Sequence, residues 1–317
     1  MLNRIQVQRI RAIGLTVSDA DRSQDFYTQA LGFEPVSDIT VETEDYSDLL
    51  GVAEATIRIV TLQLGDELIE LMQYLNIEGK PIPRDSQSND LWFQHLAIAV
   101  SDMDQAYAHL RSFPIEPISV EPQTIPPENK ASAGVRAFKF KDCDRHPLEL
   151  IWFPADKGQE KWHQQGDRLF LGIDHSAIAI SNTEQSLQFY CDLLGMQVEG
   201  GSLNWRETQA CMDNLPGAEV RITALRPQLG GLGIELLDYL VPPKGRPMPS
   251  DWRSCDIANM QVELVVNDIE QVVEMWRQNG IEFVSSRVVE FTESYCPYRQ
   301  GCLVKDPDGH GMLLIAE

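Results

Sequence analysis

Short apolar runs that end in Asp or Asn recur along the chain, and each is followed by a stretch with helical spacing. The first run is residues 13–19 (IGLTVSD), after which Phe26, Ala30 and Leu31 share one helical face before Gly32. A β-type run whose last residue can cap a helix predicts a strand followed by a helix that ends at the glycine. Two strand-like runs follow this helix, at 56–64 and 67–74. With one more strand directly after the helix, the segment is predicted to be a β-α-β-β-β module.

The same order of elements repeats, which indicates a tandem duplication. Residues 176–182 (SAIAISN) and the later segment 189–196 match residues 13–19 and 26–33. Weaker restarts begin at Leu96 and Val262 and divide each half again. We therefore predict an α+β protein of four β-α-β-β-β modules. Their expected ranges are about 8–82, 91–155, 170–245 and 255–317, grouped into two domains, 1–156 and 169–317, that a polar linker, 157–168, joins.

Composition and charge limit the classes of partner. The chain has 48 acidic and 26 basic residues and a formal net charge of −22, so phosphate backbones and anionic membrane surfaces are not expected to bind. No apolar run approaches the ~18 residues that cross a bilayer, and the first residues lack the apolar core of a signal peptide, which predicts a cytoplasmic protein. The six cysteines form no C-x-x-C pair and are expected to be reduced thiols.

Acidic and imidazole side chains recur at matching positions in the modules. Glu70, Glu149 and Glu235 each lie inside the last apolar strand of a module. A carboxylate in a half-buried strand is costly unless something compensates its charge, and three equivalent ones suggest a cation. His95 and His175 share a position in the first strand of their modules. Because neutral imidazole commonly binds divalent metals, these pairs of His and Glu favour a metal site.

Two other histidines are interpreted as structural. His146 and His310 occupy matching places in turns before a module's last strand. His310 persists in the module where Leu313 stands at the position of the strand Glu. A histidine that is kept without its acidic partner is expected to be a turn or packing residue.

The modules resemble the vicinal oxygen chelate superfamily, which includes glyoxalase I, methylmalonyl-CoA epimerase, bleomycin resistance proteins and extradiol dioxygenases. The resemblance rests on the β-α-β-β-β order, the Phe-Tyr and Leu-Gly signatures within 26–33 and 189–196, and turn–strand endings such as 142–150. It implies that two modules close into a cup-shaped mixed sheet and that metal ligands come from the first and last strands of each module. The implied ligand positions are Ala12 with Glu70, His95 with Glu149, His175 with Glu235, and Gln261 with Leu313.

The resemblance leaves two ways of pairing the modules. If neighbours pair, each of two cups holds three of the possible ligands. If the second module pairs with the third and the first with the fourth, one cup gathers a complete set: His95, Glu149, His175 and Glu235. The other cup is then degenerate and contains Ala12, Glu70, Gln261 and Leu313. We favour this crossed pairing because it puts every unsuitable residue in one cup.

The implied site predicts one divalent metal ion per chain, with iron, manganese, nickel, cobalt and zinc as candidates, and a small-molecule substrate that chelates it through two oxygens. Resemblance to glyoxalase I implies proton transfer of the isomerase, epimerase or lyase type, with Glu149 as the base and Glu235 as its partner. One alternative is an Fe(II) extradiol-type dioxygenase that uses His95, His175 and one Glu. Another is a metal-free small-molecule binding protein of the bleomycin resistance type.

Three residues are predicted to contact the substrate. Arg136 and Arg221 lie on strands of their modules and could hold a carboxylate, and Tyr239 could line the cup. A fused chain of four modules can complete its cups as a monomer, and a homodimer also fits the sequence.

Overall fold

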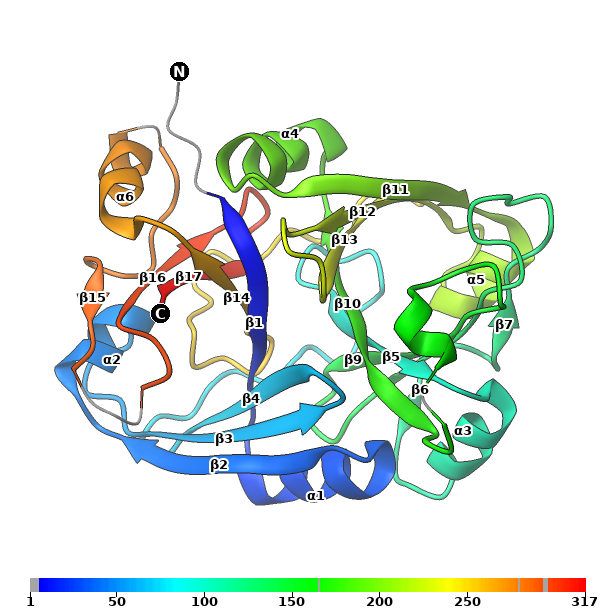
Figure 1. Cartoon of the computed structure of the whole chain (residues 1–317), viewed down its shortest axis with the longest axis horizontal. Coiled ribbons are helices and arrows are strands. Elements are labelled where there is room, and N and C mark those ends of the chain that lie inside the picture. The colour runs from blue at the N-terminus through cyan, green and yellow to red at the C-terminus, as the bar shows by residue number, and fades with distance from the viewer. Residues whose placement is uncertain (1–5, 165, 279, 293–295) are drawn as a thin grey trace.

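The computed structural model describes residues 6–164, 166–278, 280–292 and 296–317. The strands form two curved sheets with helices around them (Figure 1). Among the described helices, none combines the length and apolar character that crossing a bilayer requires. None of the six cysteines, all of which are described, is in a disulfide.

The first and third modules have the same elements in the same order. The first contains β1 (Val7–Thr16), α1 (Ala20–Leu31), β2 (Glu34–Val41), α2 (Glu44–Leu50), β3 (Ile57–Leu64) and β4 (Glu67–Tyr74). The third contains β10 (Phe170–Ile180), α4 (Thr183–Leu187) continued by a π-helical turn (Gln188–Leu193), β11 (Gln197–Asn204), α5 (Arg206–Asp213), β12 (Glu219–Arg226) and β13 (Gly233–Val241). The short helices α2 and α5 are additions to the predicted module.

The second and fourth modules are shorter versions of this plan. The second contains β5 (Gln94–Val100), α3 (Met103–Leu110), β6 (Glu116–Pro117), β7 (Gln123–Thr124), β8 (Arg136–Lys141) and β9 (Pro147–Trp152). The fourth contains β14 (Met260–Val266), α6 (Ile269–Gln278), β15 (Val289–Glu290), β16 (Gln300–Lys305) and β17 (Gly311–Ala316). The linker between the second and third modules contains one 3₁₀ turn, Glu160–His163.

The expected capping residues begin and end the helices. The side chains of Asp19, Asp102 and Asn182 each accept a hydrogen bond from the backbone N–H three residues later, which satisfies a donor that the helix itself leaves unpaired. Gly32 ends α1 with a φ of 73°, a left-handed conformation that glycine adopts at little cost. The sequence signals for these helix boundaries are therefore confirmed.

The sheets combine modules in the crossed arrangement. One sheet has the strand order β15-β16-β17-β14-β1-β4-β3-β2, and the other has β11-β12-β13-β10-β5-β9-β8-β6. The first module therefore joins the fourth, blue with orange and red in Figure 1, and the second joins the third. The antiparallel pairs β1–β14 and β5–β10 hold the modules together at the centre of each sheet. Each sheet takes one module from each predicted half, and the boundaries 1–156 and 169–317 stay predictions.

The recurring tyrosines and turn histidines connect modules that belong to different sheets. Tyr27 donates from its hydroxyl to Asp142 at 3.1 Å, and Tyr190 donates in the same way to Asp306 at 2.9 Å. In the same turns, Nε2 of His146 lies 2.8 Å from the carbonyl oxygen of Ile257, and Nε2 of His310 lies 3.0 Å from that of Ala179. The structural interpretation of both histidines is confirmed.

The largest hydrophobic core contains side chains of α1, α3 and α6 together with one face of both sheets. The opposite, concave face of each sheet has separate clusters. We call these concave sides the first cup (sheet β11 to β6) and the second cup (sheet β15 to β2). Helix α5 covers the first cup and α2 covers the second, at opposite ends of the molecule in Figure 1.

Candidate metal centre

Four adjacent strands of the first cup carry the four predicted ligands. Their order across the sheet is β13, β10, β5 and β9, and each contributes one side chain. The residues are Glu235, His175, His95 and Glu149, in the same order. In the strand register, Ala97 lies opposite both His175 and Glu149, and Ala177 lies opposite both His95 and Glu235. These small neighbours leave room for the longer side chains to converge.

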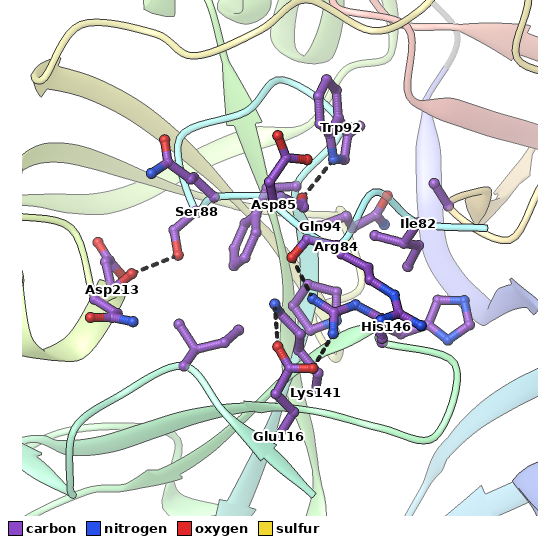
Figure 2. Close-up of a pocket in the computed structure, with 18 of the residues that line it drawn as sticks. Ile82, Arg84, Asp85, Ser88, Trp92, Gln94, Glu116, Lys141, His146 and Asp213 are labelled. Atoms are coloured by element: carbon purple, nitrogen blue, oxygen red, sulfur yellow. Dashed lines mark hydrogen bonds and ion pairs between the residues drawn. The ribbon is translucent and has the colours of Figure 1, made fainter.

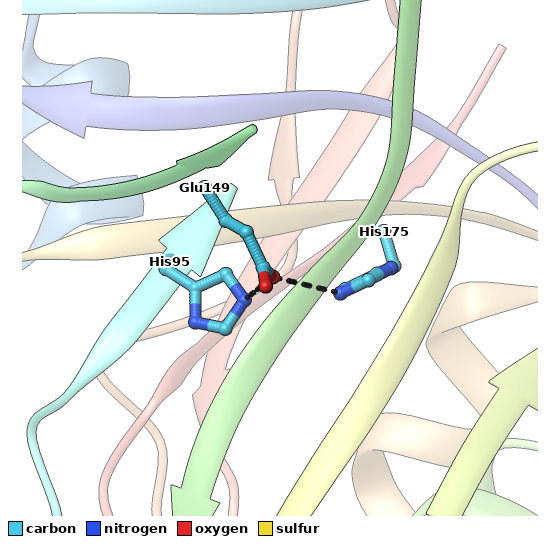
Figure 3. Close-up of side chains that lie close together, drawn as sticks. All are labelled: His95, Glu149 and His175. Atoms are coloured by element: carbon cyan, nitrogen blue, oxygen red, sulfur yellow. Dashed lines mark ion pairs between the residues drawn. The ribbon is translucent and has the colours of Figure 1, made fainter. Parts of the chain in front are cut away.

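The side chains of His95 and His175 converge at Glu149 (Figure 3). Nε2 of His95 lies 2.8 Å from Oε2 of Glu149, and Nε2 of His175 lies 3.8 Å from the same oxygen. Oε2 of Glu235 lies 3.4 Å from Nε2 of His175. The Glu235 side chain is 26% exposed, whereas His95, Glu149 and His175 are buried. Three of the four side chains are therefore shielded from solvent, and Glu235 is partly exposed.

The donor atoms fit a first-row divalent metal. Both ring nitrogens of His95 and Nε2 of His175 are buried and make no hydrogen bond of normal geometry among the described residues, although the two Nε2 atoms face the Glu149 and Glu235 carboxylates. Buried polar atoms without a well-oriented partner cost stability unless something binds them, and a cation between these nitrogens and carboxylates would do so. Ligands held about 2.1 Å from one metal lie about 3 to 3.5 Å apart, close to the spacings seen here. Two imidazoles and two carboxylates are donors that iron, manganese, cobalt, nickel or zinc accept.

Burial and charge set the protonation of the centre. Burial lowers the pKa of His95 to about 4, so its ring is neutral near pH 7, as metal binding requires. Burial, followed by the Asp174 and Glu149 carboxylates, raises the pKa of Glu235, although His175 opposes this shift. Burial also disfavours ionised Glu149, yet the adjacent imidazoles and the Lys139 ammonium lower its pKa to about 2. Closely spaced carboxylates are the environment that a bound cation stabilises.

Asp174 supports the centre, although no repeated pattern in the sequence marks it. Asp174 is the extra residue of a bulge in β10, and its Oδ2 lies 2.9 Å from Nδ1 of His175. Trp162 of the linker donates from Nε1 to Oδ1 of Asp174 at 2.7 Å. Metal-binding histidines commonly donate their second ring N–H to a carboxylate, which fixes the ring and its tautomer. The only sequence signal was that Asp174 directly precedes His175.

The structure brings one of the three predicted substrate contacts to the first cup. Tyr239 is buried there, two residues from Leu237 and four from Glu235 on one face of β13. Arg136 instead pairs with Asp104 of α3 at 2.7 Å, and Arg221 pairs with Asp238 at 3.1 Å. Each arginine is the direct neighbour, along its strand, of a residue that faces the cup. Because side chains alternate between the two faces of a strand, both arginines point to the other face.

Figure 2 shows a cavity of about 250 Å³ at one end of the first cup, lined by residues that include Gln94, Lys141 and Asp213. Phe93 lines this cavity, and its ring centroid lies 5.7 Å from that of His95. Asp213 at the end of α5 also lines it, together with Lys141 and Glu116, which form an ion pair at 2.9 Å. Phe93 therefore places the cavity next to the centre, and none of the four ligand residues lines it.

The second cup has an internal cation in place of a complete ligand set. Arg11 forms ion pairs with Glu70 and, at 2.6 Å, with Glu263. Arg11 is the counterpart of Asp174, because each lies at the bulge of its central strand. Burial and the Glu70 carboxylate raise the pKa of Glu263, although Arg11 opposes this shift. Ala12, Gln261 and Leu313 occupy the remaining ligand positions, and all three are buried.

The comparisons with known proteins agree with this architecture. The family model of the Glyoxalase/Bleomycin resistance protein/Dioxygenase superfamily matches residues 9–150 and 172–313, and the chain belongs to that superfamily. A 2-epi-5-epi-valiolone epimerase from Actinomyces sp. is 32% identical over 151 residues, which cover 46% of this chain and 80% of the relative. The uncharacterised protein YwkD of Bacillus subtilis is 27% identical over 146 residues, covering 45% of this chain and 96% of that protein.

Solved structures share the fold over the whole chain. Glyoxalase I from Zea mays is 15% identical, with a TM-score of 0.60, and the match covers 97% of this chain and 92% of that chain. A putative dioxygenase from Bacillus subtilis is 12% identical, with a TM-score of 0.59, covering 98% of this chain and 86% of that chain. At these identities the likeness concerns the fold.

Proposed function

We propose that the chain is a divalent-metal-dependent isomerase of the epimerase type, which moves a proton at a carbon atom beside a carbonyl group. The observation that carries the proposal is the convergence of two buried imidazoles, whose Nε2 atoms make no hydrogen bond of normal geometry, with two carboxylates. The relative named 2-epi-5-epi-valiolone epimerase gives independent support for the class of reaction.

The proposed roles follow from the position of each side chain. His95, Glu149, His175 and Glu235 would hold the metal ion, which when bound acts as a Lewis acid on a substrate carbonyl. Glu149 accepts the proton from the neighbouring carbon. Glu235 lies on the far side of the two histidines in the strand order and borders solvent, so it is suited to deliver a proton to the opposite face. Asp174 keeps the His175 ring oriented.

The proposal is tested by metal analysis and by proton exchange. The purified chain is loaded with each candidate metal, and 2-epi-5-epi-valiolone is incubated with it in D₂O while proton NMR follows the C–H signals. We expect about one metal ion per chain and enzyme-dependent exchange. His95→Ala and His175→Ala should lose metal, and Glu149→Gln or Glu235→Gln should slow exchange by about 100-fold or more.

The matched control is Glu70→Gln, which changes the corresponding strand residue of the second cup. We expect this variant to keep both its metal and its exchange rate. A wild-type chain that retains no metal from any loading solution would contradict the proposal. That outcome would favour a metal-free binding protein, which a stoichiometric complex with a small molecule would then establish.

A second candidate is an Fe(II) dioxygenase. His95, Glu149 and His175 form a group of two imidazoles and one carboxylate with ligand atoms within 4.8 Å of one another. Two histidines and a carboxylate are the ligands of many non-haem iron oxygenases. Oxygen consumption by the iron-loaded chain with catechol, in the absence of proton exchange, would select this candidate.

A further inference from the structure

A group of buried polar side chains faces the ligands across the first cup. Nζ of Lys139 donates to Oδ1 of Asp213 at 2.7 Å. Oδ2 of Asp213 accepts from the Tyr239 hydroxyl at 3.0 Å and from Nε2 of Gln209 at 2.6 Å. Oε1 of Gln209 is buried and has no hydrogen-bond partner among the described residues. We call Lys139, Gln209, Asp213 and Tyr239 the polar wall.

The polar wall adjoins both the candidate metal centre and the cavity. Lys139 is directly across from Glu149 in the β8–β9 register, and Tyr239 shares a strand face with Glu235. Nζ of Lys139 is also 5.9 Å from the ring centroid of Phe93. Asp213 and Phe93 both line the cavity, and Asp213 is labelled at its edge in Figure 2. Asp213 therefore connects the wall, which adjoins the metal ligands, to the cavity.

The second cup provides an internal comparison, because it has the same backbone and different side chains. Leu303 replaces Lys139. In the strand register, each of these two residues lies opposite the ligand position on the last strand of its own module. Leu50 replaces Asp213, since each is the last residue of the helix that covers its cup. The hydroxyl of Tyr74, the counterpart of Tyr239, has no hydrogen-bond partner among the described residues.

Equivalent serine bridges show that the two frames match closely. In the first cup, Oγ of Ser119 accepts from the backbone N–H of Lys139 at 2.8 Å and donates to the carbonyl oxygen of Met212 at 2.7 Å. In the second cup, Oγ of Ser285 accepts from the backbone N–H of Leu303 at 2.7 Å and donates to the carbonyl oxygen of Leu49 at 2.6 Å. The fold thus accepts two leucines where the first cup has an ion pair.

The stability of the fold does not account for the ion pair. Replacing a buried ion pair by well-packed apolar residues is often neutral or stabilising, because both ions lose their hydration when they are buried. The second cup already contains that replacement. Among the described residues, the polar wall has no counterpart in the second cup, so its role lies with whatever binds in the first cup.

We propose that the polar wall binds hydroxyl groups of the substrate on the side away from its metal-binding oxygens, and that the substrate is a neutral polyhydroxylated ketone. This inference rests on the proposed function. A hydroxyl group can accept from Lys139 and donate to Asp213 or to the free oxygen of Gln209. The wall has no net charge to attract an anion, because Asp213 neutralises Lys139 and the carboxylates of Glu149 and Glu235 lie near by.

The test introduces the leucines of the second cup at the equivalent positions of the first cup. The double variant Lys139→Leu/Asp213→Leu is compared with wild type and with Lys139→Leu alone, and Leu50→Met/Leu303→Met in the second cup controls for repacking. Each protein is assayed for metal content, for its urea midpoint, and for the affinity and proton exchange of two probes. The probes are inosose (pentahydroxycyclohexanone) and 2-hydroxycyclohexanone, which share the ketone and one adjacent hydroxyl group.

We expect the double variant to keep its metal and to unfold at the same urea concentration as wild type or a higher one. The single variant should unfold at a lower concentration, because it leaves Asp213 buried without its partner. Wild type should prefer inosose, and the double variant should lose that preference by about 100-fold, in affinity as well as in rate. The control should resemble wild type.

Two kinds of failure can be told apart. The inference is overturned, and the proposed function left standing, if the metal-loaded wild type does not prefer inosose, if the double variant keeps the preference, or if it is less stable than the single variant. A wild-type chain that binds no metal and exchanges neither probe would overturn both.

Discussion

At the scale of single residues, Asp174 links the linker to the candidate metal centre. Its carboxylate lies 2.9 Å from Nδ1 of His175 and accepts a hydrogen bond from Trp162 in the linker. Loss of such a carboxylate typically weakens metal binding 10- to 100-fold. We expect Asp174→Asn to bind metal about 10-fold or more weakly than wild type, measured by competition with a chelator. The control Asp104→Asn alters an exposed ion pair, and its metal affinity should equal that of wild type. An equal loss of metal affinity in both variants would contradict the role of Asp174.

His146 gives the fold a pH dependence that can be isolated. Its ring nitrogens face two acceptors, a carboxylate oxygen of Asp142 at 3.1 Å and the carbonyl oxygen of Ile257 at 2.8 Å, so both nitrogens carry protons. Burial opposes the charged ring, but Asp142 raises the pKa of His146 to about 9. Because this pKa exceeds the unfolded value of about 6.5, the stabilisation is complete well below pH 6.5 and is lost as the pH rises through 9.

The predicted effect is a difference between two proteins. The free energy of unfolding of wild type minus that of His146→Gln should fall by about 3 kcal/mol between pH 5.5 and pH 9.5. Urea denaturation at the two pH values measures it, and groups common to both proteins cancel in the difference. A difference that is constant with pH would mean that His146 is neutral in the folded chain.

The residues that the sequence identified are those whose positions repeat. His95, Glu149, His175 and Glu235 were predicted as ligands because each pair recurs at one module position, and their side chains lie near one another in the first cup. Asp174 and Lys139 were missed because a bulge places one and a long-range ion pair holds the other. Arg136 and Arg221 were assigned from strand positions alone, without regard to the face that alternation gives them.

At the scale of elements, the helices that cover the cups were harder to predict than the modules. Helix α2 runs over Glu44–Leu50 and α5 over Arg206–Asp213, lengths of 7 and 8 residues. Two turns of helix are too short to show a reliable apolar period, and such helices depend on the surface that they pack against. Because Gln209 and Asp213 belong to α5, the polar wall could not be predicted from the sequence.

The ends of these two helices offer a matched pair of substitutions. Gly51 ends α2 with a φ of 64°, and Asn214 ends α5 with a φ of 48°. An added Cβ at Gly51 would lie 2.9 Å from Cγ1 of Val284. We expect Gly51→Ala to lower the free energy of unfolding by about 1 to 2 kcal/mol or more, because it combines a left-handed backbone with this contact. Asn214→Gly, which relaxes the same conformation, should be neutral or stabilising in the same urea experiment.

At the scale of the whole molecule, the distribution of ligands predicted how the modules pair. The crossed arrangement was favoured because it separates a complete ligand set from an incomplete one, and the sheets confirm it. Strand patterns alone could not decide this, since the β1–β14 and β5–β10 pairs depend on which apolar faces meet. The cation of the second cup was also beyond prediction. Glu263 stands where the other central strands have Gly14, Ala97 or Ala177, and Arg11 has no motif around it.

The second cup should therefore depend on Arg11 for stability. Arg11 is the cation that two buried carboxylates share, and removing one partner from a buried ion pair typically costs about 3 to 5 kcal/mol. Arg11→Met should lower the free energy of unfolding by about that amount while the first cup keeps its metal. Adding Glu70→Leu and Glu263→Leu should restore most of the loss, because the charges then disappear together. Urea denaturation and metal analysis of the three proteins test this prediction. An unchanged free energy of unfolding in Arg11→Met would mean that the carboxylates are neutral. Loss of metal from Arg11→Met would mean that the two cups are coupled.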